Sequence, residues 1–307
     1  MSDLSILFPG QGSQEPGMGR DLAEKWTTAM DMWKFAEKES GLALREIYWD
    51  GDASAMAKTD ALQPALTVVN LSIWLYLKDS INPVATAGHS LGEFASLSAS
   101  GILSTEDTIK AVALRGKLMS QVANEDHGMA AILKLGQSDV EEAVEFGAKE
   151  SAKELRIANY NSPAQYVISG EKAAIDVAGS MIKEKKGRAI PLPVSGAFHS
   201  PLIQEAANEF SSYLSKLTWN TPAFPVYFNV TAAPESNYEK IKKIMSSQMT
   251  SSVRWIEIIN NQYNAGVRNF LELGPKGVLT KLLSANLKGK EYEGKGIGNI
   301  EQAEAIK

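Results

Sequence analysis

The stretch VATAGHSLGEFA, residues 84–95, decides how this chain folds. Small and β-branched residues predict a short buried strand that ends at Gly88, and the apolar segment 94–99 predicts a helix. Between them lies the pentapeptide Gly-His-Ser-Leu-Gly. A strand, a Gly-x-Ser-x-Gly pentapeptide and a helix in this order are typical of a nucleophile elbow, a sharp turn that holds its serine above the carboxyl edge of a parallel sheet.

Steric requirements of the turn explain why the pentapeptide begins and ends with glycine. The turn forces Ser90 into strained backbone geometry, and a side chain at Gly88 or Gly92 would collide with the neighbouring strand or helix. We expect the backbone N–H of Leu91 to point into the same space at the start of the helix, where it can stabilise an oxyanion. The pentapeptide alone leaves a second interpretation open, in which Ser90 only caps the helix that follows.

Composition excludes several classes of protein. The chain has 307 residues, of which 44% are hydrophobic, and this is enough for one large domain or for a large domain that carries a smaller one. Its formal net charge of −5 provides no global basic field for nucleic acid. The absence of cysteine excludes disulfides, a thiolate nucleophile and a thiolate metal site. There is no signal-peptide pattern and no apolar run of membrane-spanning length, so we expect a cytoplasmic protein without membrane contact.

The order of predicted elements changes near residue 126. Residues 1–125 and 197–307 contain strands that alternate with helices, which is typical of an α/β fold with a parallel sheet. Between them, residues 126–196 predict strand, helix, strand, strand, helix and strand, the order of a ferredoxin-like unit. We therefore predict an α/β-hydrolase-like large domain, formed by 1–125 and 197–307, into which a small ferredoxin-like domain is inserted.

Three other segments have specific predictions. Residues 21–38 have one apolar stripe and predict a single helix. The sequence Asn-Tyr-Asn-Ser-Pro at 159–163 predicts a turn between two strands of the small domain. The tail after Gly289 is polar and contains several glycines, so we expect it to be peripheral.

Histidine is scarce, and this narrows the search for a base that could activate Ser90. The chain contains only His89, His127 and His199. His89 adjoins the serine on a sharp turn, so its side chain should diverge from that of Ser90, and His127 lies in a polar, turn-like stretch. If Ser90 has a histidine base, His199 is the remaining candidate.

Two polar side chains outside the pentapeptide are further candidates for the site. Gln11 lies in the glycine-rich loop 9–14 after the predicted strand 5–8, and its amide could donate a hydrogen bond toward Ser90. Arg115 lies inside a predicted helix, with apolar neighbours one turn away. The pattern favours a solvated guanidinium whose stem packs on these neighbours. The other interpretation is a partly buried guanidinium that binds an anionic ligand.

Motifs spread along the chain resemble those of the malonyl-CoA:acyl carrier protein transacylases and the related acyltransferase domains of fatty acid and polyketide synthases. They follow the family's order over almost the whole chain, up to Gly289. One such motif carries little information, whereas this many in order is specific. The motifs are FPGQGSQ (8–14), QPA (63–65), GHSLGEF (88–94), Arg115-Gly116, GMAA (128–131), NSP (161–163), GAFHS (196–200), SVRW (252–255) and ELGP (272–275).

The resemblance implies how the reaction would proceed. Ser90 would attack a thioester and carry the acyl group, and His199 would be its base. The catalytic residues of the family look more like a Ser-His dyad than a triad, because a backbone carbonyl, here that of Gln248, would orient the histidine. A coenzyme A thioester would be the first substrate, and the phosphopantetheine thiol of an acyl carrier protein would then accept the malonyl group. The resemblance implies no metal and no bound cofactor.

The resemblance also implies how the acyl group would be recognised. Gln11 and the N–H of Leu91 would form the oxyanion hole. Arg115 would bind the free carboxylate of malonyl, which reverses the interpretation that the pattern favours. Phe198 would crowd the methyl branch of methylmalonyl. The implied activity is therefore malonyl transfer to acyl carrier protein in fatty acid biosynthesis.

The sequence leaves alternative functions to be considered. A stand-alone acyltransferase of polyketide synthesis would carry the same motifs. A hydrolase that removes wrong acyl groups from carrier proteins would share the frame, but it needs no carboxylate-binding Arg115. The missing acid partner and the inserted unit speak against a general esterase of the α/β-hydrolase type. A non-catalytic module that only docks carrier proteins is disfavoured by four intact residues, Ser90, His199, Gln11 and Arg115.

Overall fold

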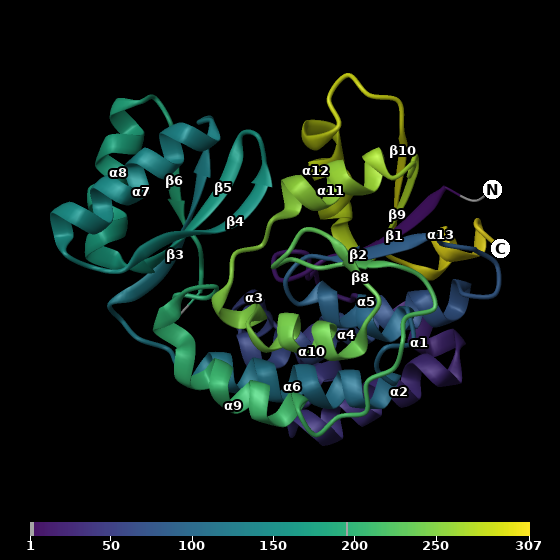
Figure 1. Cartoon of the computed structure of the whole chain (residues 1–307). Helices are drawn as coiled ribbons and strands as arrows, with labels where there is room; N and C mark the ends of the chain where they lie inside the picture. Colours follow the sequence, from purple (N-terminus) through teal and green to yellow (C-terminus); the bar gives the residue numbers. More distant parts are fainter. Residues whose placement is uncertain (1–2, 195) are drawn as a thin grey trace.

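A computed structural model describes residues 3–194 and 196–307, and the strands of this part form two sheets. Figure 1 shows the smaller sheet and its helices as a lobe beside the larger one, with the N- and C-termini near each other on the far side of the larger lobe. The six-stranded sheet contains, in spatial order, β10 (Glu293–Ile297), β9 (Asn269–Leu273), β1 (Leu4–Phe8), β2 (Ala85–Gly88), β7 (Val226–Tyr227) and β8 (Pro234–Glu235).

The large sheet is parallel from β10 to β7, and β8 is antiparallel to β7 at one edge. Its central strand β1 is buried on both faces because successive side chains point to opposite sides. Ile6 and Phe8 pack into one core, and Leu7 packs into the core on the other face. A parallel strand covered on both faces is expected to be almost continuously apolar, as this one is apart from Ser5.

Helices cover both faces of the large sheet. Those that share the core of Ile6 and Phe8 include α1 (Arg20–Lys25), α2 (Thr27–Ser40), α4 (Thr59–Leu77), α5 (Gly92–Ala99), α6 (Thr105–Gln121), α9 (Gln204–Leu214) and α10 (Tyr238–Ser246). The opposite face is covered by α11 (Trp255–Asn264) and α12 (Val278–Asn286). Short helical segments are η1 (Glu46–Asp50), α3 (Ala53–Met56), η2 (Pro201–Ile203), η3 (Gln248–Thr250), η4 (Pro275–Gly277) and α13 (Ile300–Glu304).

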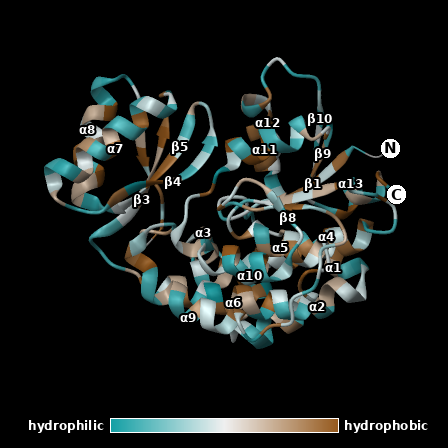
Figure 2. Cartoon of the chain, viewed as in Figure 1, coloured by the Kyte–Doolittle hydropathy of each residue, from teal (hydrophilic) through white to brown (hydrophobic). Residues whose placement is uncertain are grey.

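The small sheet is antiparallel and contains, in spatial order, β4 (Leu155–Ser162), β5 (Gln165–Glu171), β3 (His127–Leu133) and β6 (Arg188–Pro191). Its helices α7 (Gln137–Ser151) and α8 (Lys172–Glu184) share one apolar core with the strands. Figure 2 shows hydrophobic residues along β4 and β5 and many hydrophilic residues along α7 and α8. The strand order is that of a ferredoxin-like unit, so the predicted fold class is confirmed.

We propose that the boundary between the domains follows the sequence prediction, with 1–125 and 197–307 as the large domain and 126–196 as the small one. In support, α6 of the large domain ends at Gln121 before β3 begins at His127. The chain returns to the large domain at η2, which begins at Pro201 after β6.

The predictions for three segments were wrong in part. Residues 21–38 form two helices, because Trp26 between them is extended and places its ring edge-on against Tyr76 of α4. The predicted turn at 159–163 belongs largely to β4, which continues to Ser162. The tail after Gly289 adds β10 to the edge of the large sheet, and Ile297 is fully buried. Because an edge strand is joined to its neighbour by backbone groups, β10 needs no apolar pattern.

Among the helices of residues 3–194 and 196–307, none combines the length and the hydropathy that crossing a bilayer requires.

Candidate active site

The turn after β2 has the geometry of a nucleophile elbow. Ser90 has a φ of 50°, a left-handed conformation that non-glycine residues rarely adopt. A Cβ added at Gly88 would lie 2.0 Å from the carbonyl carbon of Gly92, and a Cβ at Gly92 would lie 2.0 Å from the carbonyl oxygen of Phe8. Both contacts are impossible, so the turn requires glycine at both positions, as the sequence predicts.

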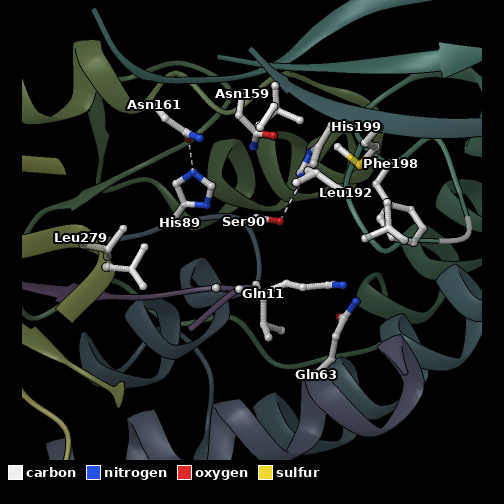
Figure 3. Close-up of a pocket in the computed structure, with 18 of the residues that line it drawn as sticks. Gln11, Gln63, His89, Ser90, Asn159, Asn161, Leu192, Phe198, His199 and Leu279 are labelled. Carbon is white, nitrogen blue, oxygen red and sulfur yellow. Dashed lines mark hydrogen bonds between the residues drawn. The ribbon is translucent and has the colours of Figure 1, made fainter. Parts of the chain in front are cut away.

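A cavity of about 280 Å³ opens beside Ser90, and residues of both lobes line it. Figure 3 shows Ser90 and His199 directed toward each other, with Gln11 and Gln63 on the opposite side of the cavity. Of the predicted site residues, Gln248 does not line the cavity. Those that do are Gln11, Ser90, Leu91, Arg115 and His199.

His199 is oriented to accept the proton of the serine hydroxyl. Its Nε2 lies 2.8 Å from the Oγ of Ser90. Its Nδ1 lies 2.9 Å from the carbonyl oxygen of Ser251 and 3.2 Å from that of Gln248. Since these oxygens only accept hydrogen bonds, they hold the proton on Nδ1 and leave Nε2 as the acceptor. Two carbonyls therefore orient His199: that of Gln248, as predicted, and a nearer one, that of Ser251, which the sequence reasoning missed.

The surroundings of His199 keep the imidazole neutral. Burial lowers its pKa to about 3, with a further lowering by the charge of Arg115, and the hydrogen bonds to the carbonyls of Ser251 and Gln248 oppose this shift. A neutral imidazole can accept a proton from a hydroxyl, whereas an imidazolium cannot.

Arg115 is buried, contrary to the interpretation that the sequence pattern favours. Only 1% of the residue is exposed, and Nη1 donates to the Oε1 of Gln63 at 2.8 Å. Nη2 donates to the Oε1 of Gln248 at 3.1 Å and lies 3.4 Å from the Oγ of Ser90. Helices α6 and α4 pack closely at Gly116, where an added Cβ would lie 3.0 Å from the backbone of Thr59. This close packing brings the guanidinium beside Gln63.

The charge of Arg115 is retained despite its burial. Desolvation lowers the pKa of the guanidinium to about 10, and the negative charge of Glu93 opposes this effect. The group is therefore cationic at neutral pH, and it lies close to the serine hydroxyl. A cation at this place can bind a carboxylate that is attached to the serine through a short acyl chain.

Two hydrogen-bond donors that border the cavity beside Ser90 are available for an oxyanion. A Cβ at Gly10 would lie 2.4 Å from the carbonyl oxygen of His89 and 3.6 Å from the nitrogen of Leu91, so glycine keeps this space open. Within residues 3–194 and 196–307, neither the N–H of Leu91 nor the side-chain amide of Gln11 donates a hydrogen bond to another protein group. Both groups border the cavity, which is the arrangement that an oxyanion hole needs.

The family model of the acyl transferase domain matches residues 6–303 of this chain. The chain belongs to the acyl transferase domain family. Its sequence is 38% identical over 288 residues to the malonyl CoA-acyl carrier protein transacylase of Staphylococcus aureus (strain MSSA476), with 92% of each chain covered.

Solved structures of similar proteins support the same assignment for this acyl transferase. An acyl carrier protein S-malonyltransferase from Vibrio cholerae superposes with a TM-score of 0.93 at 35% identity and covers 100% of both chains. A malonyl-transacylase in complex with its type II polyketide synthase acyl carrier protein has a TM-score of 0.93 at 32% identity, with 99% of each chain covered. The resemblance drawn from the motifs is therefore confirmed.

Sequence reasoning missed side chains that support the elbow of this acyl transferase. Asn229, two residues after β7, accepts a hydrogen bond from the N–H of Ser90 and donates one to the carbonyl of Gly88, both at 2.7 Å. An asparagine just after a strand that pairs with β2 is the signal that could have identified it. His89 points away from Ser90, as predicted, and its Nε2 lies 2.7 Å from the Oδ1 of Asn161 on β4.

Proposed function

We propose that this acyl transferase moves malonyl from coenzyme A to the phosphopantetheine thiol of an acyl carrier protein, as a step of fatty acid biosynthesis. One observation carries the assignment of the site: the Oγ of Ser90 lies 2.8 Å from His199 and 3.4 Å from the guanidinium of Arg115 in one cavity. A nucleophile, a base and a binding group for a carboxylate are thus within reach of one short dicarboxylic acyl group.

In the proposed first half-reaction, Ser90 attacks the thioester carbonyl of malonyl-CoA while Nε2 of His199 takes the hydroxyl proton. The N–H of Leu91 and the amide of Gln11 stabilise the negative charge on the carbonyl oxygen. Coenzyme A leaves as its sulfur receives the proton from His199, and malonyl remains as an ester on Ser90.

In the second half-reaction, the same groups work in reverse. His199 takes the proton of the phosphopantetheine thiol, whose sulfur attacks the malonyl ester, and then returns that proton to the oxygen of Ser90. Coenzyme A enters as part of a substrate, and the scheme uses no bound cofactor. We also propose a cytoplasmic location for the protein.

The test is intact-protein mass spectrometry after brief exposure to malonyl-CoA, with and without a phosphopantetheine-bearing acyl carrier protein. We expect a malonyl adduct that forms in one burst and disappears when the carrier is added, with malonyl appearing on the carrier. Steady release of free malonate without a carrier would instead indicate a carrier-protein acyl hydrolase. No adduct and no transfer would contradict the proposal.

Arg115→Ala should reduce the preference for malonyl over acetyl. The guanidinium can donate two parallel hydrogen bonds to the malonyl carboxylate, which acetyl lacks. Loss of hydrogen bonds to a charged group costs roughly 1.5–3 kcal/mol, or about 10- to 100-fold in malonyl loading. The measurement is competition between malonyl-CoA and acetyl-CoA for Ser90. Arg254→Ala, which removes a partly exposed arginine paired with Glu257, is the control and should keep the preference. An unchanged preference in Arg115→Ala would assign the carboxylate to another residue.

Phe198→Ser should admit methylmalonyl. The Phe198 side chain is 4% exposed and lines the cavity, and a Cβ added at Gly196 would lie 2.9 Å from its ring. The ring therefore has little freedom to move away from a methyl branch, and overpacking costs roughly 1–3 kcal/mol, or about one to two decades of preference. Competition between malonyl-CoA and methylmalonyl-CoA for Ser90 measures this preference. Phe146→Ser, on the exposed side of α7, is the control. Continued exclusion of methylmalonyl by Phe198→Ser would show that another group sets the limit.

A further inference from the structure

Glu93 is a buried carboxylate that lies directly beside the nucleophile elbow. It stands in the first turn of α5, it is 0% exposed, and it does not line the cavity. Its Oε1 accepts a hydrogen bond from the backbone N–H of Asn229 at 2.7 Å, and its Oε2 accepts one from Nε2 of Gln248 at 3.0 Å. Burying a carboxylate is unfavourable unless its oxygens are hydrogen-bonded. The role of Glu93 is therefore inferred from these two hydrogen bonds.

Both partners of Glu93 hold the backbone of Ser90. The side-chain Oδ1 of Asn229 accepts a hydrogen bond from the N–H of Ser90 at 2.7 Å. Nε2 of Gln248 donates to the carbonyl oxygen of Ser90 at 2.9 Å. The φ of 50° at Ser90 is strained and persists only where the surroundings fix it. Glu93 therefore holds the two residues that bind the amide and the carbonyl of the strained serine.

Glu93 also determines which end of the Gln248 amide faces Arg115. An ionised carboxylate only accepts hydrogen bonds, and so does the carbonyl of Ser90, so Nε2 of Gln248 must face both. The Oε1 of Gln248 is then turned to Nη2 of Arg115, at 3.1 Å. If the amide were reversed, its oxygen would face two acceptors, and its NH₂ group would face the donor Nη2 of Arg115.

We propose that Glu93 is a positioning residue, which fixes Ser90 and the guanidinium of Arg115 through Asn229 and Gln248 without touching the substrate. This role rests on the proposed function, because it requires that Ser90 carries the acyl group and that Arg115 binds the malonyl carboxylate.

The ionised form of Glu93 is the one that maintains this arrangement. A protonated carboxyl would carry an O–H donor of its own, which favours reversal of the Gln248 amide. Burial raises the pKa of Glu93 to about 7, while the hydrogen bonds from Asn229 and Gln248 and the charge of Arg115 oppose the rise. Of the groups that face it, Arg115 on α6 is charged, whereas Asn229 and Gln248 are neutral. Acidification through neutral pH should thus weaken the orientation of Arg115.

The first test is Glu93→Gln, which keeps the shape but places an NH₂ group opposite one of the two donors. We expect the malonyl-over-acetyl loading ratio to fall by about 10- to 100-fold, as for a lost hydrogen bond to a charged group. Glu272→Gln is the matched control, because Glu272 is also 0% exposed and instead binds the backbone N–H groups of Leu279 and Thr280 at the start of α12. It should keep the wild-type ratio. A wild-type ratio in Glu93→Gln would overturn the role.

The second test measures the wild-type protein as a function of pH, with Glu93→Gln as the comparison. We expect its malonyl-over-acetyl ratio to fall as the pH is lowered from about 8 to about 6, and the ratio of Glu93→Gln to stay low throughout. A wild-type ratio that is independent of pH in this range would overturn the role. Failure of the proposed function would look different: Ser90→Ala would still form the adduct, or Arg115→Ala would keep the preference for malonyl.

Discussion

Ser90→Ala is expected to abolish the malonyl adduct that malonyl-CoA forms on the wild-type protein. The reason is that no other hydroxyl is held within hydrogen-bond distance of His199 Nε2 in the part of the chain that the structure describes. In a comparable serine enzyme, loss of the nucleophile lowers the rate by on the order of 10⁶-fold. Alanine removes only the Oγ, so the backbone bonds from Ser90 to Asn229 and Gln248 should persist.

The measurement is intact-protein mass spectrometry with the wild type, Ser90→Ala and Ser98→Ala. Ser98 lies on α5, the helix that follows the elbow, and its Oγ lies 3.4 Å from the Oγ1 of Thr105. It is absent from the lining of the cavity, so Ser98→Ala should form the adduct like the wild type. A full adduct on Ser90→Ala would assign the acyl group to another residue and would remove the elbow from the mechanism.

His199→Ala is expected to slow acyl loading by about 10²- to 10⁴-fold, the range for loss of a general base. In the proposed mechanism the imidazole accepts the proton of Ser90, and its pKa of about 3 keeps it neutral across the physiological range. Because the pKa is lowered, protonation of His199 begins only well below neutral pH. A loss of malonyl preference between about pH 8 and pH 6 would therefore originate from Glu93 and not from the base.

The single-turnover rate of adduct formation measures the effect, since it separates acylation from carrier binding. His127→Ala is the control. His127 begins β3 in the small sheet and does not line the cavity, so its replacement should leave the loading rate unchanged. An unchanged rate in His199→Ala would mean that another group or a water molecule takes the proton.

The nucleophile elbow was predictable because the glycines that its turn requires lie next to Ser90 in the chain. The conformation of Ser90 depends on whether Gly88 and Gly92 carry side chains, and these positions lie within a few residues of it. The strand 5–8 was predictable from its apolar run 6–8, because a strand buried on both faces has no solvent-exposed side and needs few polar residues. The scarcity of histidine reduced the choice of base to His199 without any knowledge of the fold.

The edge strand β10 was not predictable from its pattern. Its sequence, Glu-Gly-Lys-Gly-Ile, contains a single large apolar residue, and its pairing with β9 depends on backbone groups that every sequence has. The same applies to the carbonyl of Ser251, which contacts His199 through a backbone atom. Side-chain patterns carry no information about such bonds.

By itself, the sequence determined the fold class, the elbow and the resemblance to acyltransferases, because these depend on local steric requirements and on the order of motifs. Only the tertiary structure decided that Arg115 is buried beside Ser90, since this follows from the close packing of α6 on α4 at Gly116. It also decided that Glu93 reaches Asn229 and Gln248, which lie 136 and 155 positions away in the chain. Burial and long-range hydrogen bonding depend on the approach of distant segments, and a side-chain pattern within one helix cannot specify them.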